Sequence, residues 1–403
     1  MTAEAEGDRL ARRNALILAG ASALAGANAA VVFATGAIVG SMLAPSPSLA
    51  TVPVSCFVVG MAAGTLPGGM ITRRYGRRVT FWIGTGCGAV MGLLACVAVL
   101  KGLFWLFCCA TFFGGLYASV AQSYRFAAAD TASPAFRPRA ISWVMAGGIF
   151  AGVLGPQLVN VTMGIWPPYR FAASYLAQAV VAIIAMGLLS FVRIPLPPPP
   201  VEGAPAGRSL AQIMREPRFI AALICGVVSY ALMNLVMTSA PLAMQMCGLS
   251  VSDSNTAIQW HVVAMYAPSF ITGSLVTRFG SPRVIIAGLA LIAAAAGVHL
   301  AGITVWHFWI GMVLLGIGWN FGFVGATAMV AEICAPPERT KVQSFNDFLI
   351  FGTMAVGSFS SGHLLASYGW SLVNDVVFPP VVIALLVLGW LRFSRHGRQV
   401  PAV

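Results

Sequence analysis

The chain consists mainly of long apolar stretches separated by short polar turns. Each stretch runs for about 20 residues or more, the length that a helix needs to cross roughly 30 Å of hydrocarbon. No alternating pattern typical of β-strands recurs along the sequence. The pattern therefore predicts an all-α polytopic membrane protein with twelve transmembrane helices, at residues 14–40, 48–71, 79–100, 103–126, 138–163, 169–193, 218–246, 255–277, 283–302, 306–331, 342–365 and 374–393.

The composition excludes a water-soluble domain. Of the 403 residues, 59% are hydrophobic and only 8% are charged, whereas soluble domains carry about 25% charged residues. The 8 cysteines show no paired spacing typical of a zinc site or a disulfide framework. Because neither a nucleophile with its base nor a phosphate-binding loop is found in the sequence, we predict no enzymatic activity and no organic cofactor.

Basic residues lie almost entirely on one side of the predicted membrane. Of the 23 lysines and arginines, only Lys101 and Arg170 fall in loops on the other side. Cytoplasmic loops of membrane proteins carry such an excess of basic residues. We therefore expect both termini and the central linker to be cytoplasmic. The net charge of +12 is explained as a topology signal, and no nucleic-acid partner is inferred from it.

One polar, proline-rich segment interrupts the apolar pattern between the sixth and seventh predicted helices. It reads IPLPPPPVEGAPAGRS at 194–209, a composition typical of a semi-rigid linker. The sequence therefore predicts an N-terminal six-helix bundle at 1–193, a cytoplasmic linker at 194–217 and a C-terminal six-helix bundle at 218–403.

The two predicted bundles share a short sequence repeat. Residues 69–84 align without gaps on residues 273–288, and five pairs coincide: Gly69 with Gly273, Arg74 with Arg278, Tyr75 with Phe279, Gly76 with Gly280 and Gly84 with Gly288. Both copies fall in the turn between the second and third helix of their bundle. Repeats of this kind place the substrate near the middle of the membrane, between two halves that rock to alternate its access.

The first copy, GMITRRYGRR at 69–78, resembles the loop motif G-x-x-x-D-R-x-G-R-R of the major facilitator superfamily. With the helix count and the linker position, the resemblance covers nearly the whole chain. It implies two pseudo-symmetric six-helix bundles, and a gating or structural role for Gly69, Arg73, Arg74, Gly76, Arg77, Gly273, Arg278 and Gly280. Arg73 replaces the acidic residue of the motif. We therefore expect Arg73 or a neighbouring arginine to pair with Asp347, early in the eleventh helix.

Polar residues are scarce within the predicted helices, but soft sulfur and nitrogen donors are grouped there. Met233 and Met237 lie four residues apart, hence on one helix face. His261 and Met265 repeat this spacing on the following helix, which returns through the membrane. At a rise of about 1.5 Å per residue, Met237 and Met265 both lie about 14 Å deep. The four residues are therefore expected to form a ladder that descends to the midplane.

Thioether, imidazole and thiolate groups select copper over hard ions, so the ladder predicts a copper site. Further candidate ligands are Met244 in the same stripe, Met61 at the position that the repeat relates to Met265, and Cys225 and Cys247 as relay ligands. The competing interpretation is packing, because methionine readily fills the space between helices.

Within the superfamily, the motifs Met-x-x-x-Met and His-x-x-x-Met resemble those of bacterial copper importers that supply haem–copper oxidase assembly. The resemblance implies copper import across the bacterial cytoplasmic (inner) membrane by a monomer embedded in lipid. The acceptor would be a copper chaperone or a copper-exporting ATPase. Two alternatives remain open: a proton-coupled multidrug or small-metabolite transporter, in which the methionines only pack, and a membrane copper sensor that transports nothing.

Overall fold

The computed structural model describes residues 3–130, 132–133, 136–194, 208–334 and 338–396. Helices account for nearly all of these residues, so their backbone polar groups are paired within each helix, as hydrocarbon surroundings require. The elements are α1 (Ala3–Leu43), η1 (Pro47–Leu49), α2 (Val52–Lys101), α3 (Phe104–Ala121), α4 (Tyr124–Asp130), α5 (Arg137–Thr162), α6 (Ala172–Leu189), α7 (Leu210–Met214), α8 (Pro217–Met246), α9 (Val251–Tyr266), α10 (Ser269–Phe279), α11 (Ser281–Ala301), α12 (Val305–Ile333), α13 (Arg339–Asp375) and α14 (Phe378–His396).

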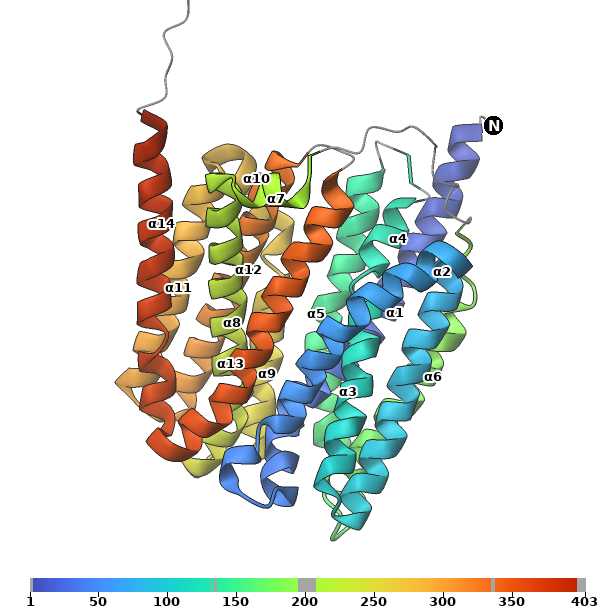
Figure 1. Cartoon of the computed structure of the whole chain (residues 1–403). Helices are drawn as coiled ribbons and strands as arrows, with labels where there is room; N and C mark the ends of the chain where they lie inside the picture. The colour runs from blue at the N-terminus through green and yellow to red at the C-terminus, as the bar shows by residue number, and fades with distance from the viewer. Residues whose placement is uncertain (1–2, 131, 134–135, 195–207, 335–337, 397–403) are drawn as a thin grey trace, which may run out of the picture.

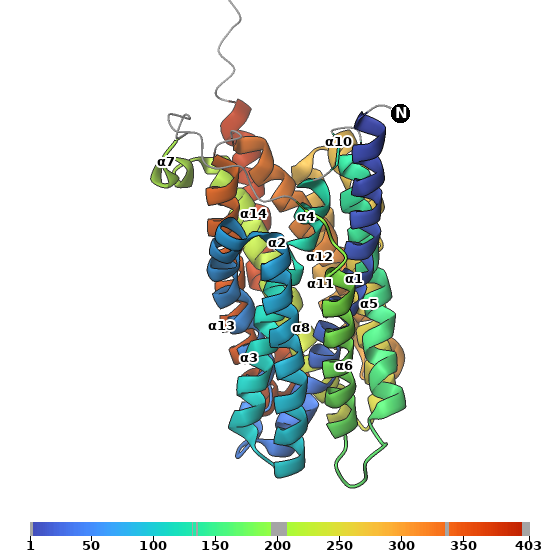
Figure 2. The same cartoon turned by 90° about the vertical axis from the view of Figure 1, so that its right-hand side faces the viewer.

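Two groups of helices stand side by side. The first half, α1–α6, is coloured blue to green in Figure 1, and the second half, α7–α14, is coloured from green to red. The long helices run along a common direction in both views (Figures 1 and 2). This is the all-α arrangement of two bundles that the sequence predicts.

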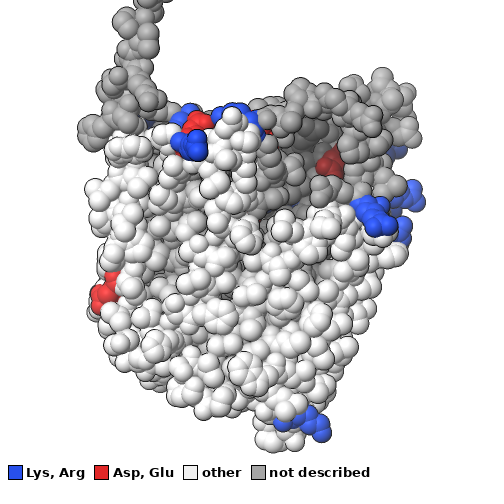
Figure 3. Space-filling model, in the orientation of Figure 1, with Lys and Arg blue, Asp and Glu red and all other residues white. Residues whose placement is uncertain are grey.

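The start of α1 and the end of α14 lie at the same end of the molecule (Figure 1). Charged side chains gather mostly at this end, above a largely uncharged flank (Figure 3). We call it the arginine-rich end, and we call the opposite end, which holds the turn between α1 and α2, the far end. Among the described residues, the ion pairs join Arg77 to Asp130 at 3.0 Å, Arg208 to Glu216 at 3.0 Å and to Glu338 at 2.8 Å, and Arg218 to Glu332 at 3.2 Å.

A buried carboxylate fixes the chain before α7 to the start of α13. Glu338 is 1% exposed and accepts hydrogen bonds from the backbone N, Nε and Nη2 of Arg208 at 2.7, 2.9 and 2.8 Å. The Glu338 carboxylate, with a smaller contribution from Glu216, holds the pKa of Arg208 above its usual value. This contact joins elements of the second half only.

Ten described helical segments are long and apolar enough to cross a membrane, and the difference from the predicted twelve arises at two places. Pro268, which lacks a backbone N–H, separates α9 from α10 within the predicted eighth helix at 255–277, so neither piece reaches spanning length. The predicted eleventh and twelfth helices count as one apolar segment, Phe345–Leu391. Its backbone bends at Gly369, where φ is 77°.

The sequence repeat has a structural counterpart in the two turns. Gly76 and Gly280 both have φ of 83°, a left-handed conformation that glycine adopts without the steric cost of a Cβ. In both copies the arginine guanidinium lies 5.3 Å from the centre of the next ring: Arg74 over Tyr75, and Arg278 over Phe279. The two halves therefore repeat this turn in conformation as well as in sequence.

Candidate substrate cavity

A cavity of about 80 Å³ lies between the two halves. Its wall combines residues of α1, α2, α3 and α5 with residues of α8, α9 and α13. None of the lining residues is charged. The wall contains five methionines, Met61, Met233, Met237, Met265 and Met354, and four aromatic residues, Phe33, Phe57, Tyr230 and Tyr266. It also contains two side-chain amides, Gln122 and Asn234.

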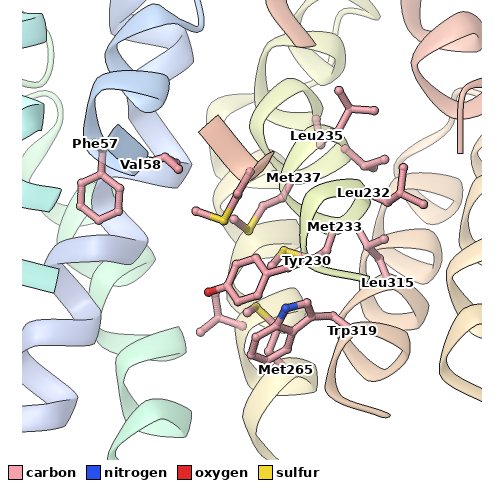
Figure 4. Packing of buried hydrophobic residues seen from close by; sticks show 14 of the residues in the cluster. Phe57, Val58, Tyr230, Leu232, Met233, Leu235, Met237, Met265, Leu315 and Trp319 are labelled. Atoms are coloured by element: carbon pink, nitrogen blue, oxygen red, sulfur yellow. The ribbon is translucent and has the colours of Figure 1, made fainter. Parts of the chain in front are cut away.

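Three of the four predicted ladder residues lie in this wall. Met233, Met237 and Met265 are 1%, 3% and 7% exposed, and they line the cavity because α8 and α9 turn these faces toward the first half. Figure 4 shows them with Tyr230 on one side of the cavity and Phe57 on the other. Met61 joins the wall from α2. The sequence pattern therefore located the cavity, although not its chemistry.

His261, the fourth ladder residue, is not in the cavity wall. Its side chain is fully buried, and Nδ1 donates a 2.7 Å hydrogen bond to the carbonyl oxygen of Met312 in α12. A carbonyl can only accept, so Nδ1 carries the proton. The imidazole therefore joins α9 to α12 within the second half, and it does not share the cavity wall with the three methionines.

The other candidate ligands also lie away from the cavity. Cys225 and Met244 are buried without lining it. Cys247 follows α8 at the far end, and burial raises the pKa of its thiol. In the part of the chain that the structure describes, no three histidine, cysteine, aspartate or glutamate side chains are grouped to hold a metal ion.

The predicted arginine–aspartate pair between the two halves is not formed by the described side chains. The Arg73 side chain lies outside the described residues. Asp347 accepts a 3.2 Å hydrogen bond from its neighbour Asn346. Arg77 is bound instead to Asp130 of its own half, with Nε 3.0 Å from Oδ2.

Aromatic rings behind the wall hold the two tyrosines in place. Tyr230 packs edge-on against Trp319, Phe323 and Phe351, with ring centres 5.2, 5.0 and 5.8 Å apart. Tyr266 makes a similar contact with Trp319 at 6.4 Å. Edge-to-face contacts of this kind are each worth about 0.5–1.5 kcal/mol. The cavity therefore presents rigid aromatic walls to a ligand.

The cavity also contains hydrogen-bonding groups that are not among the predicted site residues. Asn234 Nδ2 donates a weak 3.4 Å hydrogen bond to the carbonyl of Met354, while its buried Oδ1 has no partner among the described residues. Gln122 lies opposite, in the segment after α3. An amide within an apolar membrane helix is itself a signal of function. That signal was present at Asn234, directly beside Met233.

The two halves are hydrogen-bonded to each other at the far end. The bonds between described residues of the two halves are Ser55 Oγ to Ser358 Oγ at 2.9 Å, Thr51 Oγ1 to the carbonyl of Ser358 at 3.5 Å, Gln157 Nε2 to Gln259 Oε1 at 2.7 Å and Asn255 Nδ2 to Asn160 Oδ1 at 2.5 Å. Their positions near the start of α2 and α9 and the end of α5 place this closure beyond the cavity.

Two helix bundles with a cavity between them, hydrogen-bonded to each other at one end, are the arrangement typical of transporters that work by alternating access. The chain belongs to the major facilitator superfamily, whose sequence model matches residues 16–267 and 222–402. Among solved structures, the xylose transporter XylE of E. coli, in a partially occluded inward-open conformation, aligns with a TM-score of 0.73. It is 13% identical and covers 95% of this chain and 98% of its own. A bacterial homologue of the human lysosomal transporter Spinster, inward-facing, also has a TM-score of 0.73, at 15% identity and 98% and 99% coverage.

Proteins related in sequence align with this chain over nearly its whole length. The riboflavin transporter RfnT of Brucella anthropi is 48% identical over 393 residues, which cover 97% of this chain and 98% of that protein. The uncharacterized transporter YdeG of Bacillus subtilis is 29% identical and covers 96% of this chain and 93% of its own.

The prediction of a copper importer for haem–copper oxidase assembly is wrong, and so is copper as the bound or carried species. The relative that is 48% identical over nearly the whole chain is a riboflavin transporter, and the described residues contain no group of three histidine, cysteine, aspartate or glutamate side chains that could hold a metal ion. In the structure the His261 side chain does not line the cavity that Met233, Met237 and Met265 share. Thioethers without that imidazole form an apolar wall, and the small-metabolite alternative fits the relative better.

Proposed function

We propose that the protein carries riboflavin, or a closely related flavin, across the membrane by alternating access. The observation that carries this proposal is the 48% identity to a riboflavin transporter over nearly the whole of both chains. At this similarity the cavity-lining helices of the two proteins are expected to superimpose.

The chemistry of the cavity supports the same cargo. The flavin ring system is planar, with an apolar dimethyl edge and a polar edge of carbonyl and N–H groups. Tyr230 and Phe57 provide aromatic surfaces for stacking, and thioethers make favourable contacts with aromatic rings. Asn234, with an unpartnered Oδ1, would receive an N–H of the polar edge. A mostly apolar site with a few placed polar groups is typical of small-molecule binding.

The excess of basic residues supports an orientation with the arginine-rich end in the cytoplasm. In this orientation the far-end hydrogen bonds close the outer side, and the cargo leaves toward the cytoplasm. The two bundles, 1–193 and 218–403, would rock about the cavity so that these bonds break when the outer side opens.

Uptake of riboflavin into proteoliposomes tests the proposal. Purified protein should give saturable uptake above that of empty vesicles. Ala118→Trp, at a residue that lines the cavity, should abolish most of the uptake because the indole fills the space. The matched control is Val180→Trp in α6, where the side chain is 50% exposed on the surface; this variant should retain uptake. Absence of saturable uptake by the wild-type protein would refute the proposal.

A further inference from the structure

A second cavity of about 80 Å³ adjoins the first on its arginine-rich side. The two share five lining residues: Gly26, Ala29, Ala118, Gln122 and Tyr266. The second cavity adds residues that lie nearer the arginine-rich end of each helix, such as Ser22 in α1 and Met145 in α5. One ligand can therefore extend from the first cavity into the second.

The chemistry changes from one cavity to the next. The first contains five methionines and several aromatic rings, and none of its lining residues is charged. The second is lined mainly by small residues, with Ser22, Gln122 and Arg125 as its polar groups and Tyr266 at the junction. The lining residues of the first cavity suit contact with a flat aromatic ring, and those of the second suit contact with a narrow, flexible, oxygen-rich chain.

The guanidinium of Arg125 has a hydrogen-bond donor that no described residue satisfies. Its Nε is buried and has no hydrogen-bond partner among the described residues, while its guanidinium lies 4.8 Å from the Phe126 ring. The charge of Asp347 is close enough to interact with it, but the hydrogen bond of that carboxylate comes from Asn346. A guanidinium has five N–H donors, and a charged residue at a membrane helix is rarely kept without a role.

We propose that the second cavity is the subsite for the hydroxylated side chain of the cargo. Arg125 and Gln122 donate hydrogen bonds to its hydroxyl oxygens while the ring lies among the methionines and tyrosines. This inference rests on the proposed function, because riboflavin combines a planar ring with a chain of four hydroxyl groups. The proposed subsite makes Arg125 a residue that determines specificity for the hydroxylated side chain of the cargo.

A comparison of two flavins tests the subsite. Riboflavin and lumiflavin share the ring, and lumiflavin has a methyl group in place of the hydroxylated chain. Dissociation constants of both are measured by flavin fluorescence on purified, full-length protein. The wild-type protein should bind riboflavin about tenfold or more tightly than lumiflavin, because hydrogen bonds to charged groups are the stronger ones. Arg125→Gln should weaken riboflavin binding by at least about fivefold and leave lumiflavin binding within about twofold.

Binding of lumiflavin by the Arg125→Gln variant also shows that this variant is folded. The matched control is Arg283→Gln, at an exposed arginine that lines neither cavity. This control variant should change neither dissociation constant. Equal weakening of both flavins by Arg125→Gln, or equal wild-type affinities, would overturn the subsite but leave the proposed function standing. If the wild-type protein binds neither flavin, the proposed function fails and the subsite with it. If the Arg125→Gln variant binds neither flavin, the Gln122→Ala variant provides the test. Weaker binding of riboflavin alone supports the subsite, and equally weakened binding of riboflavin and lumiflavin refutes it.

Discussion

Ser55 in α2 donates a 2.9 Å hydrogen bond to Ser358 in α13, which lies 303 positions later in the chain. Both side chains are fully buried, and the bond joins the first half of the protein to the second. The helices approach closely beside it, since a Cβ added to Gly362 would lie 2.2 Å from Thr51 Oγ1. This contact therefore marks a place where the halves must separate if the far end is to open.

A disulfide at this position should stop transport. In the double variant Ser55→Cys/Ser358→Cys, side chains that now touch should oxidise to a disulfide with little backbone movement. Uptake should be lost under oxidising conditions and return after reduction, because the link prevents the far end from opening. Each single cysteine variant is the control for the native thiols. Full uptake by a completely cross-linked protein would show that the halves do not separate here.

Gly148→Ala should impair binding through Tyr266. A Cβ at Gly148 would lie 2.7 Å from the Tyr266 ring, which lines both cavities, so the ring must move. We expect the KM for riboflavin to rise by about fivefold or more, in line with the overpacking cost of about 1–3 kcal/mol. Gly187→Ala is the matched control, because no atom lies within 4 Å of that Cβ. An unchanged KM for riboflavin in the Gly148→Ala variant would show that Tyr266 does not contribute to the binding site.

Met237→Leu should lower flavin affinity moderately. Leucine keeps the apolar volume but loses the sulfur–ring contact, worth about 0.3–1.5 kcal/mol, so the dissociation constant should rise roughly twofold to tenfold. Met91→Leu, at a buried methionine that lines neither cavity, should have no such effect. Cells that produce the wild-type protein, the Met237→Leu variant or the Met91→Leu variant should contain the same amount of copper. A copper deficit confined to Met237→Leu would contradict an apolar role for this wall.

His261→Ala should destabilise the protein without changing its ligand affinity. The substitution removes the hydrogen bond to the Met312 carbonyl and leaves a cavity, at a combined cost of about 2–4 kcal/mol. The apparent melting temperature in detergent should fall, while the folded fraction keeps its riboflavin dissociation constant within about twofold. His363→Ala, at an exposed position, should melt like the wild type. Lost affinity at an unchanged melting temperature would place His261 in the binding site instead.

The sequence determined the class of the protein because transmembrane helices depend on local properties. Apolar length and the positions of glycine and proline are properties of one segment at a time. The repeated turn at Gly76 and Gly280 could also be recognised from the sequence, because a left-handed turn favours glycine wherever the turn lies. The sequence did not show that the eighth predicted helix divides into α9 and α10 at Pro268, because the apolar stretch continues through the proline.

Only the tertiary structure decided what the soft side chains do. The i, i+4 spacing placed Met233 with Met237, and His261 with Met265, on shared helix faces. It did not say how each helix is rotated against its neighbours. In the structure, Met265 turns to the cavity while His261, one turn away, turns to the α12 backbone. Arg125 counted only as a topology signal until packing placed it beside a cavity. Helix length and hydropathy are encoded locally, whereas a binding site is made by side chains from distant helices that only packing brings together.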